Sequence, residues 1–134
     1  MSDKNSTIHF VITGGTIDSF YDGSKDTAVT NEHSIETSKH KKILVTHGTY
    51  TMSDTARFLK ANLKRKDQVI ILTGSMIPIN GFSPSDGPFS LGYAIAQLEH
   101  LKPGIYVCVN GRVFSPEEVV KVIGEGRFSS IFER

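Results

Sequence analysis

The chain contains four short, mainly apolar runs, and each of them stops at a turn that contains glycine. They cover residues 8–12, 42–46, 69–72 and 105–109. A strand that is buried on both faces gives a continuous apolar run, whereas a half-exposed strand alternates apolar and polar residues. We therefore expect these four segments to be parallel strands of a sheet that is covered on both sides.

Three further segments have the features of helices. Residues 51–63 and 91–101 repeat apolar side chains every three or four positions, as on the buried face of an amphipathic helix. Residues 116–123 are a shorter candidate, because Ser115 can cap the first turn and Pro116 occupies its first position. The alternation predicts an α/β fold with a Rossmann-like or flavodoxin-like parallel sheet and right-handed crossovers.

The remaining segments are harder to assign. Residues 18–42 are polar with little periodicity, which favours a functional loop, although a β-hairpin around Asp22 and Gly23 is an alternative. Residues 1–6 read as a flexible N-terminal tail, and residues 125–134 as a weak strand or a tail. The length of 134 residues fits one domain.

Composition and charge exclude several classes of protein. Fifteen basic and fourteen acidic residues give a net charge of +1, which does not favour nucleic acid or an anionic membrane as a partner. The single cysteine, Cys108, excludes an intrachain disulfide framework and reads as a buried apolar residue. The five histidines lack metal-ligand spacing, so we expect neither a metal nor a cofactor. The polar N-terminus and the lack of a long apolar segment predict a cytoplasmic protein.

The predicted strands are followed by loops that combine glycine with hydroxyl side chains. These loops cover residues 13–16, 46–49, 73–75 and 85–87. Because ligands bind beyond the carboxyl ends of parallel strands, we expect the loops to converge on one site. No dinucleotide, P-loop or G-x-S-x-G motif is present. We interpret His47, in the second loop, as a hydrogen-bonded structural residue.

Four motifs in these loops resemble one known family when they are taken together. They read TGGTI at 13–17, VTHGTYTM at 45–52, GSMIP at 74–78 and SDGP at 85–88. In this order they resemble the bacterial-type L-asparaginase/glutaminase family, in a short form that matches its N-terminal domain. The resemblance implies an amidohydrolase that acts on L-asparagine, or less readily on L-glutamine, through an acyl-enzyme.

The resemblance also implies four catalytic residues. Thr16 matches the covalent nucleophile, and Tyr21 matches a loop tyrosine that accepts or relays its proton. Thr49 and Lys121 match a second pair that activates a hydroxyl or a water. A threonine hydroxyl needs such a base, and a desolvated lysine with a lowered pKa can supply one. From the residues alone, Lys121 reads as a solvated helix lysine, and only the resemblance reverses that interpretation. Tyr21 is equally well read as a packing residue of a hairpin.

Substrate-binding roles are implied for six further residues: Gly15, Ser34, Glu36, Gly48, Tyr50 and Ser75. Tyr50 departs from the family, whose aspartate at this position binds the α-ammonium of the substrate. Loss of a charge-assisted hydrogen bond of about 1.5–3 kcal/mol predicts capture about 10- to 150-fold weaker, or a preference for amides without an α-ammonium. Ser34 and Glu36 are candidates for binding the α-carboxylate and ammonium, and Glu36 is a possible replacement for the aspartate.

Two classes of function therefore remain open. Thr16, Thr49 and Lys121 favour an enzyme, whereas Tyr50 favours a non-catalytic or very weak relative that binds a small amide or amino acid as a regulatory or interaction module. In the family, a neighbouring subunit completes the active site. The resemblance therefore predicts a homo-oligomer, with a dimer as the minimum.

Overall fold

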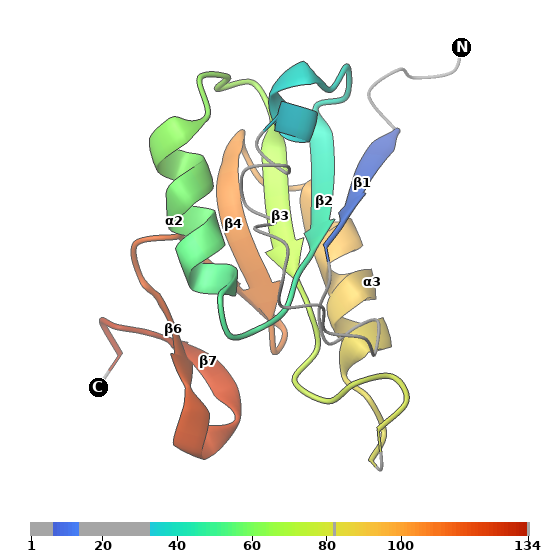
Figure 1. Ribbon diagram of the computed structural model, residues 1–134, viewed down its shortest axis with the longest axis vertical. Helices are drawn as coiled ribbons and strands as arrows, with labels where there is room; N and C mark the ends of the chain where they lie inside the picture. Colours follow the sequence, from blue (N-terminus) through green and yellow to red (C-terminus); the bar gives the residue numbers. More distant parts are fainter. Residues whose placement is uncertain (1–6, 14–32, 82, 134) are drawn as a thin grey trace.

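A computed structural model describes residues 7–13, 33–81 and 83–133 of the 134-residue chain. Within these residues, a five-stranded sheet has the order β1-β2-β3-β4-β5 (Figure 1). The strands are β1 (Ile8–Ile12), β2 (Lys42–Thr46), β3 (Val69–Thr73), β4 (Gly104–Val109) and β5 (Arg112–Phe114). The first four are parallel, and β5 is antiparallel to β4. The predicted parallel α/β sheet is confirmed.

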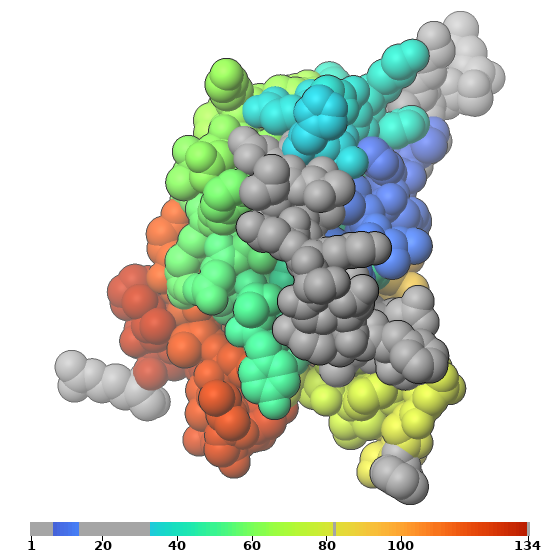
Figure 2. Space-filling model, in the orientation of Figure 1, coloured from blue at the N-terminus to red at the C-terminus, as the bar shows by residue number. Residues whose placement is uncertain are grey.

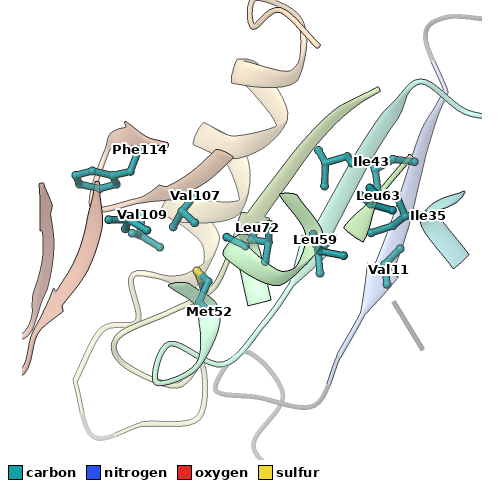
Figure 3. Packing of buried hydrophobic residues seen from close by; sticks show 14 of the residues in the cluster. Val11, Ile35, Ile43, Met52, Leu59, Leu63, Leu72, Val107, Val109 and Phe114 are labelled. Carbon is teal, nitrogen blue, oxygen red and sulfur yellow. The ribbon is translucent and has the colours of Figure 1, made fainter. Parts of the chain in front are cut away.

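Helices cover both faces of this sheet, which explains the continuous apolar runs. In β2, Ile43 and Val45 pack with helix α2 (Met52–Asn62), whereas Leu44 packs with helix α3 (Gly87–Leu98) on the other face. Figure 3 shows the cluster on the α2 side, where Leu59 lies over the sheet. Burial of each large aliphatic side chain contributes about 1.5–3 kcal/mol, so both faces stabilise the sheet.

The two helical crossovers have opposite hands. The β2–α2–β3 and β3–α3–β4 connections step across the sheet in the same direction, but their helices lie on opposite faces. With α2 in front of the sheet and α3 behind it in Figure 1, the first crossover is right-handed and the second is left-handed. The expectation that both are right-handed is therefore wrong. The long connection over residues 74–86 leads the chain to the far face.

The predicted helices agree with α2 to within one residue at each end. Helix α3 begins four residues before the predicted start, because its first turn accommodates Pro88, which needs no N–H partner there. Residues 33–37 form a short helix that their sequence did not predict. None of the described helices is both long and apolar enough to cross a membrane.

The predicted helix at 116–123 is wrong. The segment contains strand β6 (Val119–Val122), which pairs antiparallel with β7 (Arg127–Ser130) around the 3-10 turn η1 (Ile123–Glu125). Three of the four β6 residues are valine, whose branched side chain favours strands. The expected weak strand within 125–134 is β7.

Cys108 is fully buried in β4, on the α3 side of the sheet. Its burial raises the pKa of the thiol to about 12, which keeps it protonated. The interpretation of Cys108 as a buried apolar residue is confirmed.

Candidate functional site

The loops that follow β2 and β3 leave the sheet side by side. Thr46 is in register with Thr73, and the His47 N–H extends the ladder by donating to the Thr73 carbonyl at 2.9 Å. At Gly74 a β-carbon would lie only 2.3 Å from the His47 carbonyl oxygen. Glycine is therefore required where the two chains approach, and the residues that follow both strands share one edge of the sheet.

His47 stabilises the turn after β2. Its Nδ1–H donates to the Gly48 carbonyl at 2.8 Å, and its Nε2 accepts from the Thr55 hydroxyl at 2.9 Å. The ring is 4% exposed, and this burial lowers its pKa below the ordinary value of 6.5. The neutral imidazole thus has partners at both nitrogens within the fold. This arrangement agrees with a structural role.

Thr49 and Lys121 are brought together from positions 72 residues apart. The Lys121 Nζ donates to the Thr49 Oγ1 at 2.7 Å, and Thr49 is 3% exposed. Burial lowers the pKa of Lys121 below 10.5. No carboxylate pairs with Lys121 among the residues that the structure describes. The amine therefore loses a proton more readily than an ordinary surface lysine and lies within reach of a buried hydroxyl.

Tyr50 lies on the solvent side of this pair. Its side chain is exposed, and its ring centroid is 3.7 Å from the Lys121 Nζ. The electron-rich face of an aromatic ring attracts an ammonium group. Figure 2 shows the residues that follow β2 against the β6–β7 hairpin at the surface of the molecule.

The hairpin carries Lys121 to the carboxyl edge of the sheet (Figure 1). Val119 and Phe128 are both buried in the core on the α2 side. The Arg57 Nη2 donates to the Val119 carbonyl at 2.7 Å, and the Asn110 Oδ1 accepts from the Phe128 N–H at 2.9 Å. Neither Arg57 nor Asn110 was assigned a role in the site from the sequence, because the prediction made residues 116–123 a helix.

Ser75 and Asp86 lie at the same edge. The Ser75 hydroxyl is fully buried and has no hydrogen-bond partner among the described residues. The Asp86 carboxylate accepts from the Met76 and Ile77 N–H groups at 3.0 and 2.9 Å, which closes the loop after Ser75. Asp86 directly precedes α3, but its side chain binds the preceding loop and makes no cap hydrogen bond to the helix.

Ser34 and Glu36 lie at the opposite edge, in the short helix that precedes β2. The Glu36 carboxylate accepts from the Lys64 N–H, and the Gln68 side chain, just before β3, donates to the Ile35 carbonyl at 3.0 Å. These contacts hold the helix at the amino ends of the strands. The expectation that Ser34 and Glu36 bind a substrate beside Thr49 is therefore corrected: the length of β2 separates them from it.

The other predicted residues, Gly15, Thr16 and Tyr21, lie outside the described residues. The last described residue before them is Thr13, which leaves β1 beside the end of β2 with its hydroxyl 2.7 Å from the Thr46 carbonyl. Among the described residues, no group of three or more histidine, cysteine, aspartate or glutamate side chains is placed to hold a metal ion.

Residues 31–130 match the family described as asparaginase, N-terminal. The chain belongs to this family. It is similar to the glutaminase-asparaginase of Acinetobacter glutaminasificans, at 38% identity over 60% of this chain and 25% of that one. It is also similar to the L-asparaginase of Thermococcus kodakarensis, at 35% identity over 66% of this chain and 27% of that one. The matched segments span about a quarter of these relatives.

Solved structures of the asparaginase family share the fold. A probable cytoplasmic L-asparaginase from Campylobacter jejuni has a TM-score of 0.81 at 29% identity, over 94% of this chain and 50% of that one. The thermostable L-asparaginase from Thermococcus kodakarensis has a TM-score of 0.80 at 26% identity, over 95% of this chain and 52% of that one. A relative from Haemophilus influenzae is described as periplasmic, so the cytoplasmic location of this asparaginase-family chain stays a prediction.

Proposed function

We propose that this chain hydrolyses the side-chain amide of L-asparagine to L-aspartate and ammonia. The observation that carries the proposal is the 2.7 Å contact between the buried Thr49 hydroxyl and the Lys121 amine, whose pKa burial lowers. Membership of the asparaginase family supports the same reaction class. L-Glutamine is the second substrate to test, because one relative is named glutaminase-asparaginase.

In the first step, the Thr16 hydroxyl oxygen attacks the amide carbon of the substrate. Tyr21 takes the hydroxyl proton and passes it to the amide nitrogen. The carbon–nitrogen bond then breaks, ammonia leaves, and an ester joins the acyl group to Thr16. Backbone N–H groups at Gly15 and Gly48 stabilise the negative charge on the carbonyl oxygen, and a donor of this kind contributes about 3–4 kcal/mol. These roles rest on the family motifs.

In the second step, water hydrolyses the ester. Lys121, as the neutral amine, accepts a proton from the Thr49 hydroxyl, which in turn accepts one from the attacking water. The hydroxide oxygen bonds to the acyl carbon, and the proton returns to the Thr16 oxygen as the ester bond breaks. Positioned proton transfer of this kind contributes about 100- to 10,000-fold to the rate. The buried Ser75 hydroxyl is a further candidate to bind the substrate.

One observation favours a second function. The Tyr50 ring lies 3.7 Å from the Lys121 amine, and an aromatic face stabilises the ammonium form. A lysine that is held as ammonium cannot accept a proton from Thr49. On this account, the chain is a non-catalytic or very weak family member that binds a small amide or amino acid as a regulatory module.

Ammonia release from L-asparagine and L-glutamine tests the proposal, with Thr16→Ala as the inactive variant. Thr37→Ala is the matched control, because Thr37 is exposed and its hydroxyl donates to the His33 carbonyl at the far edge. We expect the native protein and Thr37→Ala to release ammonia and Thr16→Ala to release none. Calorimetric binding of L-asparagine without ammonia release by the native protein would support the binding module instead.

A further inference from the structure

We propose that Asn110 is a positioning residue that holds the β6–β7 hairpin so that Lys121 meets Thr49. The role of Lys121 in catalysis rests on the proposed function. The claim that Asn110 positions the hairpin does not depend on that function. Asn110 follows β4 at the carboxyl edge, and its side chain contacts the hairpin. It does not have to touch the substrate.

The backbone at Asn110 selects the residue type. Asn110 has a φ of 55° and Gly111 a φ of 67°, so both occupy the left-handed region in the tight turn between β4 and β5. Asparagine, aspartate and glycine tolerate this conformation better than other residues. Of the three, only asparagine and aspartate also carry a side-chain oxygen that can accept a hydrogen bond.

The Asn110 oxygen contacts the strand that faces Lys121. Phe128 is the cross-strand partner of Lys121 in the β6–β7 pair. Its N–H donates to the Asn110 Oδ1 at 2.9 Å, so this N–H points away from β6 and toward the turn after β4. Phe128 itself is 1% exposed. The hydrogen bond thus fixes β7 at the position that faces Lys121.

The hairpin needs such a contact because, among the described residues, it forms a separate two-stranded sheet with no ladder to the five-stranded sheet. A two-stranded hairpin alone is marginally stable in water. The Arg57 contact to Val119 holds the first residue of β6, two residues before Lys121. Asn110 holds the opposite strand, so each strand of the hairpin has one side-chain hydrogen bond that ties its backbone to the rest of the fold.

The test compares Asn110→Gly with Asn110→Asp. Glycine keeps the left-handed backbone but removes the acceptor, whereas aspartate keeps both. We expect Asn110→Gly to lower kcat by about 10- to 100-fold with little change in KM, as a misplaced catalytic group does. We expect Asn110→Asp to retain most of the kcat. Hydrogen exchange of the Phe128 amide should be fast in Asn110→Gly and slow in Asn110→Asp.

A second readout does not depend on activity. NMR of labelled lysine, assigned with Lys121→Met, follows the titration of Lys121 in the folded protein. We expect its pKa in Asn110→Gly to move up toward that of an exposed lysine, while urea unfolding shows the fold intact. If Asn110→Gly leaves both the Phe128 exchange and the Lys121 titration unchanged, the positioning role is wrong. If these change but the native protein releases no ammonia, the proposed function fails and the positioning role stands.

Discussion

At the scale of single residues, the site depends on one partly buried contact between the Thr49 hydroxyl and the Lys121 amine. Thr49 lies in the turn that His47 stabilises, and Lys121 lies on the β6–β7 hairpin near the end of the described chain. Desolvation of Lys121 lowers its pKa, whereas the Tyr50 ring favours its charged form. The balance between these two effects decides whether Lys121 serves as a base.

Tyr50 should limit substrate capture if the asparaginase proposal holds. Tyr50→Asp places a carboxylate where the family binds the α-ammonium, and we expect it to lower the KM for L-asparagine by about 10- to 150-fold. Tyr50→Asn is the uncharged control. Steady-state kinetics should show no comparable gain with succinamate, which lacks the α-ammonium. Equal KM values for the Asp and Asn variants would show that the charge has no role.

His47 should make stability depend on pH. Its pKa is lowered in the folded protein, so the unfolded chain binds the proton more readily as the pH falls below 6.5. The free energy of unfolding should therefore decrease as the pH falls from about 6.5 toward the lowered pKa of His47 in the folded protein. Above pH 6.5, protonation of His47 should have no effect on the free energy of unfolding. Urea unfolding of His47→Gln should show a flatter pH dependence. An unchanged slope in His47→Gln would contradict the assignment.

At the scale of elements, the ends of β2 and β3 approach so closely that position 74 has no room for a side chain. In Gly74→Ala the new methyl group meets the His47 carbonyl and the Met52 side chain. We expect a loss of about 1–3 kcal/mol in the free energy of unfolding.

Gly92→Ala is the matched control, because a β-carbon at this exposed position of α3 meets nothing within 4 Å. Removing a glycine from a helix interior should stabilise the protein by about 0.5–1 kcal/mol. Urea unfolding of both variants measures the difference. Equal stabilities would mean that the backbone at Gly74 has more room than the structure shows.

The success of sequence-based prediction also differed from element to element. Residues 42–46 and 69–72 could be predicted because two-sided burial leaves a continuous apolar run. The segment 116–123 could not, because its strand is stabilised by Phe128 and by other residues that follow it in the chain. The left-handed crossover through α3 was also beyond prediction, since the face that a helix covers depends on packing across the whole sheet.

The candidate site was only partly predictable for the same reason. Thr49 and Lys121 were selected by family resemblance, since no spacing in the sequence indicates a contact over 72 positions. Glu36 was placed wrongly, because a polar segment gives no signal of which sheet edge it reaches. Asn110 and Asp86 accept hydrogen bonds from the backbone N–H groups of Phe128 and Met76, which lie 18 and 10 positions away along the chain. The residue types asparagine and aspartate do not reveal these partners.

At the scale of the whole molecule, assembly as a homo-oligomer stays a prediction. Ile123 and Phe132 are 74% and 76% exposed on and beyond the β6–β7 hairpin. Large apolar side chains at the surface favour association. Sedimentation analysis should give about twice the monomer mass of 14.7 kDa, and Phe132→Ser should shift the protein toward the monomer. A native protein that is monomeric at all concentrations tested would contradict the expectation.

The most direct test of the account is the kcat for ammonia release from L-asparagine by Lys121→Met. Methionine keeps an unbranched side chain as far as the Cε position and removes the amine that contacts Thr49. Lys64→Met is the control, because Lys64 is exposed at the amino edge of the sheet. The account predicts a decrease of about 100-fold or more in Lys121→Met and a native value in Lys64→Met. Equal kcat values in the two variants would contradict it.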